Sequence, residues 1–129
     1  MGWCVSVDDL AEVEARLERK AVDGNRTPES GLELKWLQIG VKGLIADPQL
    51  PYFIHWVSPQ TQHPSQLGPR NDAAIAEISI AGDRDRVRDW LGTDAKKPIS
   101  EISIDWVAPH GAPGIQSVTF ETPRGAVTI

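Results

Sequence analysis

Cysteine is nearly absent from this sequence, since Cys4 is the only one among 129 residues. A single cysteine excludes a disulfide within the chain and any metal site built from several cysteines. Such sparing use of cysteine is typical of proteins that live in a reducing compartment. The segment from Met1 to Val7 also lacks the basic start and long apolar stretch of a signal peptide. We therefore expect a cytoplasmic protein.

Long apolar runs and basic clusters are lacking as well. No apolar run reaches the roughly 20 residues needed to span a bilayer, so we expect no membrane partner. The formal net charge is -5, and the only adjacent basic pairs are Arg19-Lys20 and Lys96-Lys97. A negative field repels nucleic-acid phosphates unless a basic patch offsets it. We therefore expect no nucleic-acid partner.

The common catalytic motifs are also missing. The sequence has no glycine-rich phosphate loop, no Gly-x-Ser-x-Gly elbow, no His-Glu-x-x-His and no Cys-x-x-Cys. Their absence removes the usual nucleotide-binding, serine-hydrolase, zinc-protease and thiol-redox interpretations. Whether the protein is an enzyme stays open at this level.

What the sequence does contain fits one globular domain over residues 1–129. The apolar fraction is 40% and the charged fraction 24%, which is ordinary for a folded chain. A chain of this length buries roughly two thirds of its unfolded surface, so no cofactor is needed to hold it together. Eleven glycines and ten prolines predict short elements joined by many turns.

The first half follows the pattern of a strand, a helix and further strands. Trp3 to Val7 is rich in β-forming residues, and Asp8-Asp9 can cap a helix whose apolar stripe is Leu10, Val13 and Leu17. The stretch through Gly24, Asn25 and Pro28 is predicted as turns. Two strands follow: Leu32 to Leu37, and Tyr52 to Val57.

A linker of Pro, Gln, Ser and Gly at 58–72 separates this half from a second one of similar pattern. The second half has a predicted strand from Ile75 to Ile80, a helix capped by Asp83 that ends at Gly92, and strands over 99–107, 115–122 and 126–129. Helix residues Asp9, Val13 and Leu17 recur as Asp83, Val87 and Leu91, at a constant offset of 74. We therefore divide the chain into unit one (1–57), the linker (58–72) and unit two (73–129).

Two tandem βαβββ units resemble the vicinal oxygen chelate superfamily, in particular its glyoxalase-like domain proteins. The resemblance covers nearly the whole chain and rests on Trp3 to Leu17 with its Val7-Asp8-Asp9-Leu10 junction, Leu34-Lys35-Trp36, Pro51 to Trp56 followed by His63-Pro64, and Phe120 to Gly125. It implies an α+β fold in which the units form an open, cup-shaped mixed or antiparallel sheet with helices on the outer face. Longer relatives carry another unit before the one that starts here. Relatives often dimerise, and one alternative is a purely structural or dimerising domain in which Tyr52 to Val57 pairs with a neighbouring chain.

Metal enzymes of this superfamily place ligands on the first and last strands of each unit. The matching positions here fall on Gly2, on Ile75 or Ala76, and near Ile129, none of which coordinates a metal, whereas His55 can. One imidazole does not hold a metal ion that needs three or four ligands. We therefore expect no bound metal and no cofactor. The alternative is a metal-dependent lyase, isomerase or dioxygenase whose cation site is completed by another chain or a missing unit.

Alternation along the strands predicts which side chains enter the cup. If the apolar residues face the helices, the opposite face carries the candidate ligand-binding residues Cys4, Lys35, His55, Glu77 and Glu121. His55 is the first of these because an imidazole can act as an acid, a base or a ligand donor. A polar concave wall favours a small polar organic ligand, although an antiparallel sheet with one hydrated face gives the same pattern. Trp3, Trp56 and Trp90 are predicted to lie on the helix-facing side.

Overall fold

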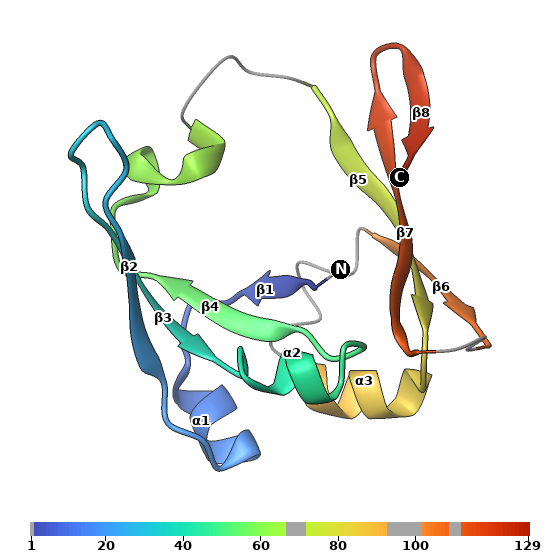
Figure 1. Cartoon of the computed structure of the whole chain (residues 1–129), viewed down its shortest axis with the longest axis horizontal. Helices are drawn as coiled ribbons and strands as arrows, with labels where there is room; N and C mark the ends of the chain where they lie inside the picture. Colours follow the sequence, from blue (N-terminus) through green and yellow to red (C-terminus); the bar gives the residue numbers. More distant parts are fainter. Residues whose placement is uncertain (1, 67–71, 93–101, 109–111) are drawn as a thin grey trace.

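The computed structural model of the chain describes residues 2–66, 72–92, 102–108 and 112–129. Within these ranges it is an α+β fold with two mixed sheets, each of four strands, which stand side by side (Figure 1). None of the described helices has the length and apolar character needed to cross a membrane. The fold class expected from the sequence is confirmed.

Unit one contributes the first sheet, which we call sheet A. Its elements are β1 (Cys4–Ser6), α1 (Ala11–Leu17), β2 (Val22–Arg26), β3 (Leu34–Ile39), α2 (Gly43–Ala46) and β4 (Tyr52–Trp56). The strand order is β1-β4-β3-β2, with β1 parallel to β4 and the other pairs antiparallel. Two short 3-10 helices, η1 (Gln60–Gln62) and η2 (Pro64–Gln66), occupy the described part of the predicted linker.

Unit two contributes sheet B. Its elements are β5 (Ala74–Ala81), α3 (Arg84–Leu91), β6 (Ser103–Val107), β7 (Gly114–Thr122) and β8 (Gly125–Thr128). The strand order is β6-β5-β7-β8, with β5 parallel to β6. The order of elements along the chain therefore repeats, but the pairing does not. In sheet A the first strand of the unit pairs only with the last one, whereas in sheet B it pairs with the two strands that follow the helix, β6 and β7.

Helix α3 begins and ends at signals that the sequence carries. The side chain of Asp83 accepts hydrogen bonds from the N–H groups of Asp85 and Arg86, at 2.9 and 3.0 Å, and α3 ends at Gly92, whose φ is 65°. These are the predicted cap and stop. Helix α1 begins later than expected, at Ala11, whose N–H donates to Asp9 at 2.9 Å.

Strand β2 lies where the sequence predicts turns, and that prediction was wrong. The segment from Val22 to Arg26 pairs antiparallel with β3, with Gly24 opposite Trp36. A Cβ atom at Gly24 would lie 2.2 Å from Nε1 of Trp36, so the indole occupies the space that a side chain would fill. Glycine and asparagine are turn residues by local preference, and here pairing across the sheet overrides that preference.

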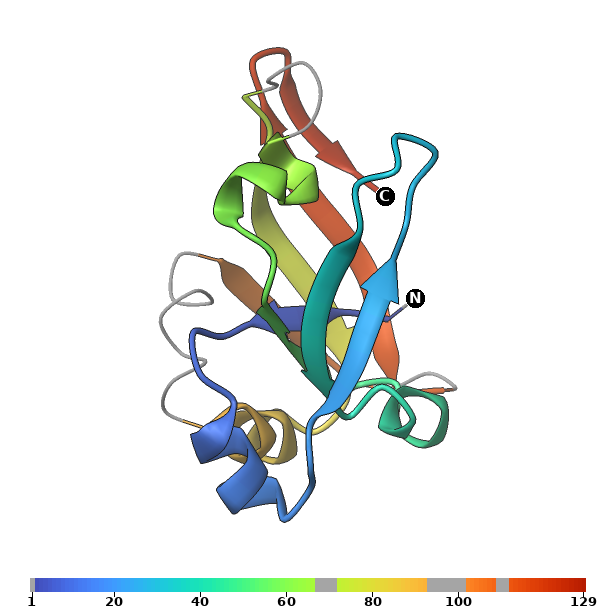
Figure 2. The same ribbon diagram turned by 90° about the vertical axis from the view of Figure 1, so that its left-hand side faces the viewer.

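The main core joins both helices to sheet A. Val13 of α1 and Val87 and Leu91 of α3 are buried together with Val5, Ile39 and Phe53 of the sheet. The two helices lie side by side at one end of the molecule, as both views show (Figures 1 and 2). Their expected place on the outer face of a cup stays a prediction.

A smaller core covers one face of sheet B. Ile78, Ile80 and Val118 are buried there, and Trp3 of unit one packs against both cores. The indole Nε1 of Trp3 also donates to the carbonyl of Gln49, at 3.1 Å. Trp3 therefore links the two sheets, and the segment from Trp3 through β1 lies beside the apolar face of sheet B.

Candidate functional site

His55 lies on β4, opposite Leu37 on β3, and is half-buried. Its Nδ1 atom is 3.1 Å from the backbone oxygen of Val7. A carbonyl oxygen only accepts hydrogen bonds, so Nδ1 carries the proton and Nε2 keeps its lone pair when the ring is neutral. This bond fixes the tautomer of His55, and Nε2 is the atom that can bind a proton or a ligand.

Lys35 lies on the same face of sheet A as His55, because Lys35 and Leu37 are two positions apart in β3 and Leu37 is opposite His55. Its Nζ atom is 3.5 Å from Oε2 of Glu33, and both side chains are exposed. An exposed pair of this kind is worth about 0–1 kcal/mol. No contact between Lys35 and His55 is present among the described residues.

Cys4 lies on the opposite face of sheet A. It pairs with Tyr52, whereas its neighbour Val5 pairs with Phe53, which is on the His55 side. The thiol is exposed. Burial, followed by a hydrogen bond to Cys4 and the charge of that side chain, raises the pKa of Tyr52 to about 12. Cys4 and Tyr52 therefore form a pair that is separated from His55 by the sheet itself.

Glu77 and Glu121 share one face of sheet B, because Glu77 is opposite Thr119, and Thr119 and Glu121 are two positions apart in β7. Both glutamates are exposed. The other face of the sheet at this level carries the buried residues Ile78 and Val118. The two glutamates thus point away from the apolar face of sheet B.

The predicted site residues consequently do not converge on a single wall. Cys4 lies on one face of sheet A, Lys35 and His55 on the other, and Glu77 and Glu121 on the polar face of sheet B. Alternation assigned side chains to faces within each strand, but it did not show how the two sheets are oriented. Ligand binding by these residues stays a prediction.

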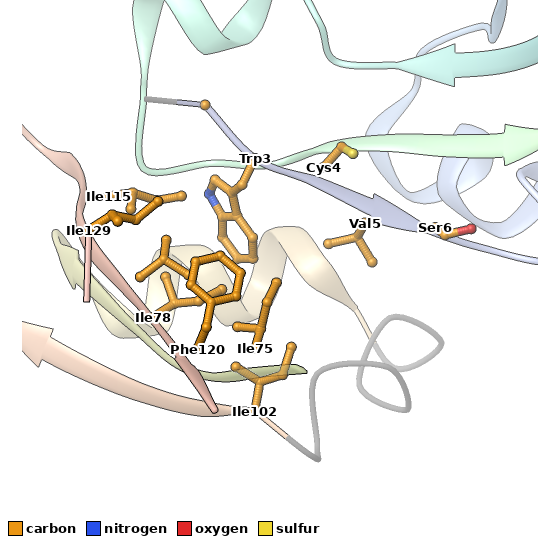
Figure 3. A pocket seen from close by; sticks show the side chains of 12 residues that line it. Trp3, Cys4, Val5, Ser6, Ile75, Ile78, Ile102, Ile115, Phe120 and Ile129 are labelled. Atoms are coloured by element: carbon orange, nitrogen blue, oxygen red, sulfur yellow. The ribbon is translucent and has the colours of Figure 1, made fainter. Parts of the chain in front are cut away.

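The structure instead places a groove between β1 and the apolar face of sheet B (Figure 3). Its volume is about 420 Å³, within the range of small-molecule sites. It is lined by Gly2, Trp3, Cys4, Val5, Ser6, Ile75, Ile78, Ile102, Ile115, Val118, Phe120 and Ile129. Sequence reasoning missed this site because it assigned the apolar residues of each strand to the helices.

The apolar wall of the groove could not be derived from alternation along the sequence alone. Ile75, Ile78 and Phe120 lie on one face of sheet B because β5 has a register shift between Ile75 and Glu77, which restores the alternation. Ile75 is 41% exposed, and Ile129 is 64% exposed. An apolar face that is partly exposed along a concave surface is typical of an interaction site.

Two tryptophans form a second cluster on the Cys4 side of sheet A. Trp36 and Trp56 are directly opposite each other, with ring centroids 5.6 Å apart. His63 lies edge-on to Trp56, at 4.7 Å between centroids. Trp3 and Trp90 do pack against the main core, as predicted, but the placement of Trp56 on that side was wrong. Pairing with Trp36 determines its face.

A metal site is not formed by the described residues: in 2–66, 72–92, 102–108 and 112–129 there is no group of three or more His, Cys, Asp or Glu side chains that could hold an ion. The donor set that the superfamily's metal enzymes require is therefore not met in this part of the chain, and no catalytic step through a metal follows.

The segment predicted to pair with a neighbouring chain is not suited to that role, because β4 lies between β1 and β3 and both of its edges are paired.

Comparison with known proteins gives one result on the family. The family model for the glyoxalase-like domain matches residues 1–95, which is most of the chain. No curated protein and no solved structure matches the chain significantly. The matched region includes all of sheet A, β5 and α3. The chain therefore belongs to the glyoxalase-like domain family, within the vicinal oxygen chelate superfamily.

Proposed function

We propose that this glyoxalase-like domain binds a small and largely apolar organic molecule in the groove between β1 and sheet B. The observation that carries the proposal is the composition of the lining. Aliphatic and aromatic side chains from β1, β5, β7 and the segments next to β6 and β8 surround a space of about 420 Å³, and none of the lining residues has a charged side chain.

The apolar lining also determines which ligand is favoured. A ligand that buries roughly 200 Å² of apolar surface gains about 5 kcal/mol from the hydrophobic effect, before the entropic cost of binding is subtracted. A charged group in the same place would lose its hydration without gaining a partner. The sequence predicted a polar ligand held by Lys35, His55 and Glu77, and these residues do not line the groove. The proposed ligand is therefore apolar in its main part.

The remaining parts of the proposal rest on the sequence. A cytoplasmic location is supported by the single cysteine, and the absence of a nucleic-acid partner is supported by the net charge of -5. No membrane partner is proposed. A homodimer through an edge strand is compatible with the topology, because β2 and β8 each have one neighbour in their sheets, whereas β4 is an internal strand.

The proposal is tested with the uncharged, apolar fluorescent dye Nile red and two matched variants. Ile75→Lys places an ammonium group on the lining, at a position already 41% exposed. Val22→Lys makes the same kind of change at a position 56% exposed on β2, away from the groove. We expect Ile75→Lys to weaken dye binding about tenfold or more, because the buried charge has no partner, and Val22→Lys to change it less than about twofold.

Equal dye affinity in both variants and in the unmodified protein would show that the dye binds elsewhere and would contradict the proposal. Native mass spectrometry of the protein as purified from cells provides an independent measurement. A bound molecule that is retained by Val22→Lys and lost from Ile75→Lys supports the groove as its site.

A further inference from the structure

The free edge of β1 forms one side of the groove. β1 is the outer strand of sheet A and pairs only with β4 among the described residues. The N–H of Tyr52 donates to the carbonyl of Trp3 at 3.2 Å, and the N–H of Val7 donates to the carbonyl of Ile54 at 2.9 Å. The backbone groups of Trp3 and Val7 therefore point toward β4.

Successive residues of a strand direct their backbone groups to opposite edges. Because Trp3 and Val7 point toward β4, Val5 does too, and Cys4 and Ser6, which line the groove, point their N–H and C=O groups away from β4. Within the described ranges, no hydrogen bond to the N–H or C=O groups of Cys4 and Ser6 is present. The N–H and C=O groups of Cys4, followed by those of Ser6, thus offer alternating hydrogen-bond donors and acceptors. They lie next to the isoleucine, valine and phenylalanine side chains that line the groove.

We propose that the natural occupant of this groove is an extended, uncharged and apolar peptide segment that pairs with the edge of β1. This inference rests on the proposed function and specifies its ligand class. A peptide backbone supplies alternating acceptors and donors at the spacing of a strand, and its alternate side chains enter the apolar pocket, which is the pattern of strand addition to a sheet edge. The peptide is proposed to be uncharged because the lining carries no charged side chain and would not stabilise a charged segment.

A single substitution in β1 separates backbone pairing from apolar contact. Ser6→Pro removes the N–H that faces the groove, and proline is tolerated on an edge strand where that N–H has no partner in the sheet. Ser6→Ala keeps the N–H and serves as the matched control. The probe is a fluorescently labelled, capped peptide of alternating isoleucine and threonine, measured by anisotropy, and the dye is titrated in parallel.

We expect Ser6→Pro to weaken peptide binding by about three- to tenfold, which corresponds to the loss of one net hydrogen bond. Both variants lack the serine hydroxyl, so they are compared with each other: Ser6→Ala should bind the peptide about three- to tenfold more tightly than Ser6→Pro, whereas their affinities for the dye should agree within about twofold. Equal peptide affinity in Ser6→Pro and Ser6→Ala overturns the inference. If the dye binds but the peptide does not, the inference fails and the proposed function stands. If neither binds, both fail.

A second measurement uses only the unmodified protein and so does not depend on how the proline variant folds. One version of the peptide is N-methylated on its isoleucines and the other on its threonines. N-methylation blocks one edge of an extended peptide and leaves the other free, because alternate residues direct their N–H groups to opposite edges. One version should therefore lose binding and the other keep it. Equal binding of the two versions contradicts pairing with β1.

Discussion

The side chain of Gln49 holds the start of α3: its Oε1 accepts a hydrogen bond from the backbone N–H of Asp83, at 2.7 Å. The amide Nε2 of the same residue donates to Oδ1 of Asp47, also at 2.7 Å. Gln49 is buried, belongs to unit one and is hydrogen-bonded to Asp83 of unit two. This glutamine therefore connects the two units through the cap of a helix.

Gln49→Met is predicted to lower the free energy of unfolding by about 1–3 kcal/mol, because it keeps the volume of the side chain but leaves the Asp83 N–H without a partner. Gln60→Met is the control, since Gln60 is exposed on η1. The measurement is urea denaturation followed by circular dichroism. An equal effect of the two substitutions would show that the bond to Asp83 contributes nothing to stability.

Arg16 of α1 plays a comparable part at the other end of α3. Its Nη1 donates to the carbonyls of Asp89, at 3.1 Å, and Trp90, and its Nη2 donates to that of Leu91, at 3.3 Å. The cation thus satisfies the last carbonyls of the helix, where the helix dipole favours positive charge.

Arg16→Met is predicted to lower the free energy of unfolding by about 1.5–3 kcal/mol, the usual range for hydrogen bonds to a charged group. Arg88→Met, on the exposed side of α3, is expected to change stability by less than about 0.5 kcal/mol. Arg16→Lys should recover only part of the loss, because an ammonium group does not reproduce the planar fork of donors. Full recovery with lysine would mean that charge alone matters.

Gly24→Ala is predicted to disturb the tryptophan cluster. The new Cβ would lie 2.2 Å from Nε1 of Trp36, so the indole must move, and with it the contact to Trp56. We expect a loss of about 1–3 kcal/mol and a changed near-ultraviolet circular dichroism spectrum. Gly43→Ala is the control, because its Cβ would meet Arg19 at an ordinary 3.7 Å. An unchanged spectrum in Gly24→Ala would contradict the packing described here.

The raised pKa of Tyr52 predicts that the folded protein loses stability at alkaline pH. Its pKa is raised to about 12, whereas an unfolded tyrosine has a pKa of about 10. Below about pH 10 both states keep the proton, and the contribution to stability is intact. Between about pH 10 and pH 12 the unfolded chain releases the phenolic proton first, so stability falls as pH rises.

Tyrosinate absorbance measures this directly, because Tyr52 is the only tyrosine in the chain. Cys4→Ala should lower the pKa of Tyr52 but leave it above about 10, since burial is the largest cause of the shift and the contact with Cys4 comes after it. Tyr52→Phe should remove this part of the alkaline destabilisation. A midpoint near pH 10 in the unmodified protein would show that the phenol is not buried.

Local signals account for the parts of the fold that the sequence predicted well. Asp83 and Gly92 define α3 through their own backbone geometry, and the alternating residues from Ile75 to Ile80 define β5, so both could be placed without knowledge of the rest. The family could be inferred from resemblance, and the match over residues 1–95 confirms it. Strand β2 could not be predicted, because Gly24 is in a strand only through its contact with Trp36.

The candidate site was harder to predict than the fold. Alternation separates Val5 from Cys4, and Ile78 from Glu77, but it does not say which of the two faces meets the other sheet. The apolar face of sheet B packs against Trp3 and leaves the groove beside β1, so the polar residues point outward. That choice depends on how two sheets are oriented, which is a property of the whole chain.

The pairing of β1 with β4 also has a consequence for synthesis. Cys4 emerges from the ribosome long before Tyr52, and its strand has no partner in sheet A until β4 has been made. The antiparallel hairpin of β2 and β3, which is local, can form earlier. Among the strands of sheet A, β1 is therefore translated before the others but finds its partner only when β4 has been made. Until then, Val5 lacks its neighbour in the sheet and is accessible to water and to chaperones.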